Sequence, residues 1–142
     1  MHEPYCLAMV LCDNVHQDPA TGKFTLLGTF STFAARQFPA LVQFFVYSAI
    51  TDGQGQVPIR LRLVDSAVDL SGDGNAVFDE VIGECDFDDP LMTLEMRTYL
   101  KLELPAPGVF HCEIYGGEKL LMSRRLILLD ISKLDGEQSN DK

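Results

Sequence analysis

Hydrophobic and polar residues alternate along this chain with a period of two, most clearly in residues 98–130. Leu100, Leu102 and Leu104 alternate with polar or aromatic neighbours, a pattern typical of a strand with one buried face and not of a helix. Two prolines in the corner at residues 105–108 end that strand, because proline donates no ladder hydrogen bond and has a fixed φ. The pattern predicts a strand, a corner, a second strand, a Gly-Gly turn and a third strand.

The rest of the chain shows the same kind of pattern. We expect residues 24–33 to pair with the first strand as a hairpin, with Gly28 marking a bulge or a close backbone approach. Residues 34–36 could form one helical turn before Phe38-Pro39 ends it. About eight strands and no long helix are expected: residues 5–13, 24–33, 41–51, 59–65, 77–87 with a break near Gly83, 98–104, 109–115 and 119–130.

These elements predict an all-β fold, an antiparallel sandwich of two sheets. A chain of 142 residues is long enough for one core that buries roughly two thirds of the unfolded surface. We therefore expect a single domain over residues 1–134. The polar residues 135–142 carry no core face and are expected to form a frayed tail.

The corner and strand at residues 107–112 resemble the closing segment of an immunoglobulin-like domain. Those domains place an aromatic residue two positions before an inward cysteine, here Phe110 and Cys112. The chain has phenylalanine in place of the tyrosine of that motif, and it contains no tryptophan. The resemblance implies an immunoglobulin-like sandwich that is not of the antibody type.

Two further segments carry a second resemblance. The first apolar strand ends at a Cys-Asp-Asn turn, residues 12–14, and Gly-Lys-Phe-Thr-Leu-Leu-Gly-Thr-Phe follows at residues 22–30. In these features the chain is similar to a family of small bacterial β-sandwich proteins of unknown function. That resemblance implies no activity and no catalytic residue.

The charge balance narrows the choice of partners. Eleven Lys and Arg oppose 21 Asp and Glu, a formal net charge of −10. Such a surface repels phosphate backbones and anionic lipids, so we expect neither a nucleic-acid nor a membrane partner. The first apolar run follows no basic stretch, and no run approaches the ~18 apolar residues of a membrane span, which favours the cytoplasm. Without a Cys-x-x-Cys pair, the four cysteines are expected to be buried free thiols.

The negative charge is concentrated. Nine carboxylates lie between residues 65 and 89, whereas no Lys or Arg lies between residues 63 and 96; Arg60, Arg62 and Arg97 flank the region and could neutralise it. Within it, residues 69–80 fit the calcium-loop template of alternate oxygen ligands, a central glycine and a final glutamate. An EF-hand needs flanking helices, and a strand precedes this loop, so a plain acidic connection is the other interpretation. The candidate calcium ligands are Asp69, Ser71, Asp73, Asn75 and Glu80.

No known catalytic motif is present, including Gly-x-Ser-x-Gly, His-Glu-x-x-His and a phosphate loop. Neighbours along a strand face opposite sides, so His111 should point away from Cys112 and cannot activate it. We therefore expect no catalytic residue and, apart from the possible calcium ion, no cofactor.

Two predicted strands carry large apolar side chains on both faces, more than one inner face can accept. We expect the outer members to form a homo-oligomeric contact or a site for a protein partner. The sequence thus favours a non-catalytic binding or assembly module. A calcium-binding or calcium-stabilised module and a small hydrolase with an unrecognised site remain as alternatives. The candidate interface residues are Phe44, Phe45, Val46, Tyr47, Leu126, Ile127, Leu128 and Leu129.

Overall fold

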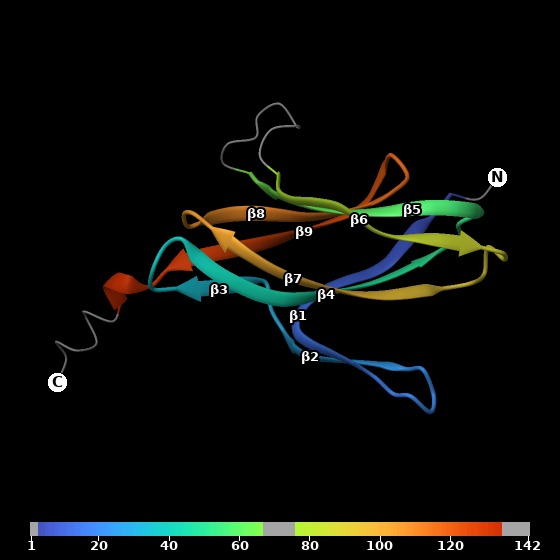
Figure 1. Cartoon of the computed structure of the whole chain (residues 1–142), viewed down its shortest axis with the longest axis horizontal. Coiled ribbons are helices and arrows are strands. Elements are labelled where there is room, and N and C mark those ends of the chain that lie inside the picture. Colours follow the sequence, from blue (N-terminus) through green and yellow to red (C-terminus); the bar gives the residue numbers. More distant parts are fainter. Residues whose placement is uncertain (1–2, 67–75, 135–142) are drawn as a thin grey trace.

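A computed structural model describes residues 3–66 and 76–134, and in these residues nine strands form two sheets that pack face to face (Figure 1). The predicted all-β fold is therefore confirmed. The strands are β1 (Tyr5–Gln17), β2 (Phe24–Thr29), β3 (Thr32–Ala35), β4 (Ala40–Thr51), β5 (Gly55–Asp65), β6 (Ala76–Phe87), β7 (Leu94–Leu104), β8 (Gly108–Gly116) and β9 (Lys119–Asp130).

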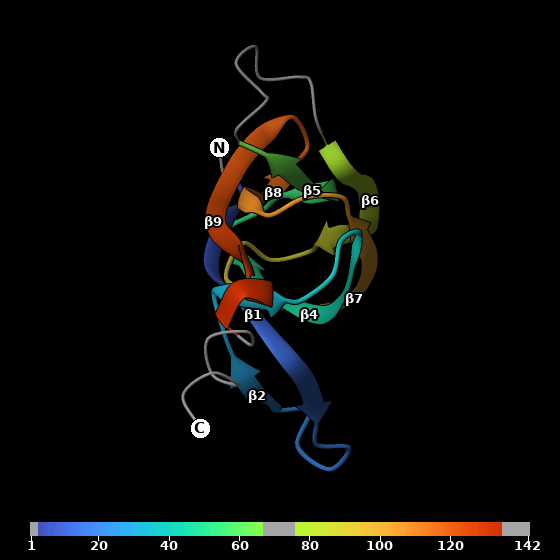
Figure 2. The same ribbon diagram turned by 90° about the vertical axis from the view of Figure 1, so that its left-hand side faces the viewer.

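Sheet A has the strand order β2-β1-β4-β7, and sheet B has the order β3-β9-β8-β5-β6 and is curled (Figure 2). All strand pairs are antiparallel except β3 with β9, which is parallel, so the expectation of a wholly antiparallel sandwich is wrong at this pair. The parallel pair arises because the predicted strand 24–33 is divided. Its first part pairs with β1 in sheet A, and its last residues cross to sheet B.

The crossing between the sheets is held by backbone hydrogen bonds and aromatic packing. Phe30 N donates to Leu11 O of β1 at 3.0 Å, and Ser31 O accepts from Ile127 N of β9 at 2.9 Å. The rings of Phe30 and Phe33 pack edge to face at 4.6 Å, and each lies 5.8 Å from the ring of Phe44 on β4. Crossing residues thereby contact both sheets. The helical turn expected at residues 34–36 is absent, because β3 continues to Ala35 beside β9.

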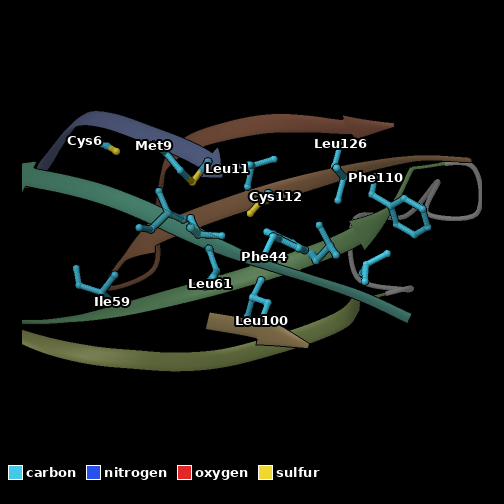
Figure 3. Close-up of a cluster of buried hydrophobic side chains, with 14 of the residues drawn as sticks. Cys6, Met9, Leu11, Phe44, Ile59, Leu61, Leu100, Phe110, Cys112 and Leu126 are labelled. Atoms are coloured by element: carbon cyan, nitrogen blue, oxygen red, sulfur yellow. The ribbon is translucent and has the colours of Figure 1, made fainter. Parts of the chain in front are cut away.

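The core lies between the sheets and consists of the inward members of the alternating pattern (Figure 3). On β7, Leu100 and Leu104 are fully buried and Leu102 is half-buried. The polar residues between them, Lys101 and Glu103, are exposed, as the spacing predicts. Phe110 and Cys112 of β8 also face inward. All four cysteines are buried and free, which confirms the prediction. Burial raises the pKa of Cys112 to about 12, so this thiol stays protonated at neutral pH.

The first hairpin, β1–β2, forms as predicted, although β1 continues to Gln17 and the turn begins only at Asp18. Beyond the part of β1 that pairs with β4, the hairpin lies on the outer side of sheet A (Figure 1). Arg97 of β7 donates to Val15 O at 3.0 Å, and the ring of Phe24 lies 5.6 Å from that of Tyr47. The hairpin thus covers part of this face.

Gly28 allows β2 to approach β1 closely, as its position in the sequence suggests. It adopts φ of +68°, and a Cβ atom there would overlap the carboxylate of Asp13 on the opposite strand. Gly83 lies beside a bulge in the β5–β6 ladder, where the register shifts between Ile59 and Arg60. Strand β6 nevertheless continues through this position, so the expected break is a bulge.

Candidate functional site

The structure divides the predicted interface residues into two groups. Four of them are buried in the core and cannot contact a partner, which corrects their assignment: Phe44, Val46, Leu126 and Leu128. The reason is the strand period, which sends alternate side chains of β4 and β9 inward. The other four lie on the outer faces, where Phe45, Tyr47 and Ile127 are half-buried and Leu129 is exposed.

The outer members on β4 belong to an aromatic group on sheet A. The ring of Phe45 lies 5.2 Å from that of Tyr99 on β7, and Tyr99 Oη donates to Gln43 Oε1 at 2.9 Å. Tyr47 donates a hydrogen bond to Glu95. Burial, aided by this carboxylate, raises the pKa of Tyr47 to about 12. Tyr99 is 51% exposed, so this face combines apolar rings with satisfied polar groups.

The acidic region is partly neutralised by two of the three predicted arginines. On the outer face of sheet B, Arg60 Nε donates to Asp79 Oδ1 at 2.5 Å and its Nη2 pairs with Oδ2. Arg62, only 8% exposed, places Nε 3.4 Å from Asp79 Oδ2 without an aligned hydrogen bond and Nη1 3.7 Å from Glu113. The third arginine, Arg97, instead contacts the backbone of the first hairpin.

Asp79 should make the stability of the protein sensitive to acid. The hydrogen bond from Arg60, together with the positive charges of Arg60 and Arg62, holds the pKa of Asp79 below its usual value of 3.8. A carboxyl group with a lowered folded-state pKa contributes stability above its unfolded-state pKa, and this contribution is lost as the pH falls through the folded-state pKa. We expect Asp79→Asn to cost about 1 kcal/mol or less near neutral pH and nothing once the pH has fallen below the folded-state pKa of Asp79.

Urea unfolding from about pH 7 to about pH 2 measures this difference. Asp86→Asn, which removes another exposed carboxylate from β6, is the matched control for net charge. If both variants change the unfolding midpoint equally at every pH, the pairing of Asp79 with the arginines does not stabilise the fold.

Of the five predicted calcium ligands, Glu80 belongs to the described residues and is exposed on β6 opposite Leu61. Asp69, Ser71, Asp73 and Asn75 lie outside the described residues. Within residues 3–66 and 76–134, no three His, Cys, Asp or Glu side chains are grouped as ligands for a metal ion.

A hollow of the described surface lies between the open edges of β1 and β9. Two adjoining cavities of about 360 and 350 Å³ share Ser31 and Arg124, and their volumes fall within the range of ligand sites. Arg124 Nη1 donates to Met9 O at 2.8 Å and so bridges sheet B to sheet A. We call this surface the seam. It is lined by Val10, Thr29, Phe30, Ser31, Ser123, Arg124, Arg125 and Ile127.

The seam is positively charged on an acidic protein. Arg124 and Arg125 are the only adjacent pair of basic residues in the sequence, and neither forms an ion pair with a carboxylate among the described residues. Arg124 lies on the inner side of β9, opposite Cys112, and Arg125 lies on the outer side, opposite His111. The basic pair was the available signal in the sequence, but it could not show that the two arginines line a hollow between β1 and β9.

The chemistry of the seam suits binding. Guanidinium groups and the hydroxyls of Thr29, Ser31 and Ser123 are hydrogen-bond donors that match carboxylates. Ile127 is the one predicted interface residue that contributes to its lining.

His111 and Cys112 lie on opposite faces of β8, as predicted, so they form no nucleophile–base pair. No helix in the described part of the chain has the length and apolar character needed to cross a membrane.

Comparison with known proteins gives a family and no activity. No curated protein matches the chain, and nothing found in these comparisons points to catalysis. The family model DUF6941, described as a family of unknown function, matches residues 7–128. This match covers every strand from β2 to β8 and most of β1 and β9. The chain therefore belongs to the DUF6941 family, as the motifs near its first two strands had suggested for a family of unknown function.

Proposed function

We propose that this protein is a non-catalytic binding module that recruits a protein partner through the seam. The observation that carries the proposal is the pair of adjoining cavities that share Arg124, the larger of which is also lined by Arg125. Two guanidinium groups without carboxylate partners in the described chain retain hydrogen-bonding capacity at a concave surface. Arginine is enriched at protein interfaces and among the residues that dominate their binding energy.

Charge and surface chemistry favour a protein over other ligands. A net charge of −10 opposes the approach of nucleic acid and anionic membranes, whereas a locally acidic protein segment can still be attracted to one basic site. The pockets of small molecules are lined mainly by apolar side chains. The larger cavity of the seam has Ile127 as its only apolar lining residue among Ser31, Ser123, Arg124 and Arg125.

The order of strands supports an immunoglobulin-like relationship as part of this proposal. Adjacent strands β1-β4-β7 follow the A-B-E order of one immunoglobulin sheet, and β5-β8-β9 follow the C-F-G order of the other. Sandwiches of this kind commonly serve as cell-surface and adhesion domains, which recognise other proteins. This likeness favours a binding role but does not specify a partner.

Affinity capture with a seam variant tests the proposal. The immobilised wild-type protein should retain a partner from cells that encode it, and that partner should bind again after separate purification. Arg125→Glu replaces an exposed side chain, so it should leave the fold intact. It should lower the affinity for the purified partner at least about tenfold, because a charged hydrogen bond is lost and a repulsive charge is introduced. Lys101→Glu makes the same charge change on the outer face of sheet A and should leave this affinity unchanged.

A purified partner that binds both variants equally would overturn the assignment to the seam. A wild-type protein that retains no partner able to bind again would overturn the binding function itself. Light scattering on the same samples identifies the case in which the retained partner is a second copy of the chain.

A further inference from the structure

The backbone of β9 offers a second binding element beside the side chains that line the seam. β9 has 12 residues, and β8 pairs with it over most of that length. On its other edge, β3 pairs with β9 only from Ile127 to Asp130 within the described chain. In the described chain, the N-terminal two thirds of that edge therefore have no hydrogen-bonded strand, although β1 of the other sheet lies nearby. An unpaired edge is a template for an added strand.

The direction of the unpaired groups follows from the hydrogen bonds of the paired part. Ile127 N donates to Ser31 O, and Ile131 N donates to Ala35 O, both at 2.9 Å and both toward β3. Alternate residues of a strand direct their N–H and C=O groups to the same edge. Ser123 and Arg125 therefore direct theirs into the seam, on a regular part of β9 beyond the register shift near Leu120 and Met122.

Side chains at the same positions define what the added strand must carry. Arg125 lies on the outer side of β9 and Arg124 on the inner side, where it also reaches Met9 O. Successive residues of an added strand would likewise point outward and inward. Two consecutive acidic residues would thus place one carboxylate beside each guanidinium, at the spacing of opposite cross-strand partners.

We infer that the seam binds an extended segment with two consecutive acidic residues, which adds to β9 as a strand in line with β3. This inference rests on the proposed binding function and deepens it by giving the chemistry of the partner. The segment would receive main-chain hydrogen bonds from Ser123 and Arg125 and charged hydrogen bonds from Arg124 and Arg125. Ser31 ends the site, because its carbonyl already occupies the N–H of Ile127.

A synthetic peptide tests the inference without knowledge of the natural partner. The probe is a fluorescein-labelled peptide, Thr-Val-Thr-Asp-Glu-Thr-Val-Thr, whose β-branched residues favour an extended chain. Its anisotropy should report binding that weakens as salt is added. Replacing Asp-Glu by Asn-Gln should weaken binding about tenfold or more, and so should Arg125→Gln in the protein. Lys101→Gln should have no effect.

Amide hydrogen exchange of the complex separates strand addition from simple charge attraction. Bound peptide should slow exchange at the amides of Ser123 and Arg125, which have no strand partner on this edge within residues 3–66 and 76–134. A third peptide, with proline in place of the threonines that flank Asp-Glu, removes backbone donors while keeping the charges, and it should bind more weakly than the parent peptide.

The outcomes that overturn the inference differ from those that overturn the binding function. Binding of the acidic peptide without slower exchange at Ser123 and Arg125 excludes strand addition. Equal binding of the Asp-Glu and Asn-Gln peptides excludes the acidic class. If no peptide binds while Arg125→Glu still lowers the affinity of the captured partner, the proposed function holds and this inference fails.

Discussion

Phe44→Ala should destabilise the protein by about 3–5 kcal/mol, a large part of the roughly 5–15 kcal/mol that holds a domain folded. Phe44 is fully buried, and its ring contacts those of Phe30 and Phe33, which cross between the sheets. Truncation would leave a cavity at the point where both sheets and the crossing meet. Chemical denaturation with a two-state fit measures the loss.

Phe45→Ala is the matched control, because the two phenylalanines are neighbours on β4 and face opposite sides. Phe45 is half-buried and packs on the exposed ring of Tyr99, so its truncation should cost about 1 kcal/mol. If the outer face forms a self-contact, Phe45→Ala should also reduce association measured by light scattering. That association should increase with salt, because screening weakens the repulsion between acidic molecules. Equal losses of stability in the two variants would contradict the observed register of β4.

Gly53→Ala should destabilise the fold by about 1–3 kcal/mol through a steric clash. Gly53 lies in the β4–β5 turn and is buried against the ring of Phe87, the last residue of β6. A Cβ atom at Gly53 would lie only 2.3, 2.4 and 2.7 Å from three carbons of that ring. Phe87 belongs to the core, so its ring cannot move without disturbing other packed residues.

A double-mutant cycle distinguishes this clash from a general sensitivity of the turn. Phe87→Leu makes room for the new methyl group, so Gly53→Ala should cost less in the Phe87→Leu background than alone. Gln54→Ala changes the adjacent exposed residue and should leave the unfolding free energy nearly unchanged. Additive losses in the double variant would show that the methyl group at residue 53 does not meet Phe87.

The sequence alone determined the strands with strong alternation and the turns between them. Residues 119–130 and 41–51 match β9 and β4 to within one residue, because period-2 patterning reports directly which side chains face the core. The buried cysteines and the pairing of β1 with β2 also follow from local pattern and turn chemistry. The same alternation separates Phe45 from Phe44, although it cannot say which of the two faces is buried.

The local pattern could not show which strands pair when they are far apart in the sequence. Residues 34–36 predict a helical turn, because alanine favours helix. Parallel pairing with β9 outweighs the preference of Ala34 and Ala35, since one isolated helical turn is unfavourable. The division of residues 24–33 between two sheets likewise depends on Phe30 and Ser31 contacting β1 and β9, which are far apart in the sequence. A strand as short as β3 has too few residues for its alternation to predict which sheet it joins.

The candidate site is decided by tertiary structure for the same reason. Arg124 and Arg125 form a visible basic pair in the sequence, yet their significance depends on the edge of β9 that β3 leaves unpaired and on the open edge of β1. Alternation specifies the two faces of a strand but contains no information about its two edges. Edges are set by which strands pair across the fold, and that is a property of long-range packing.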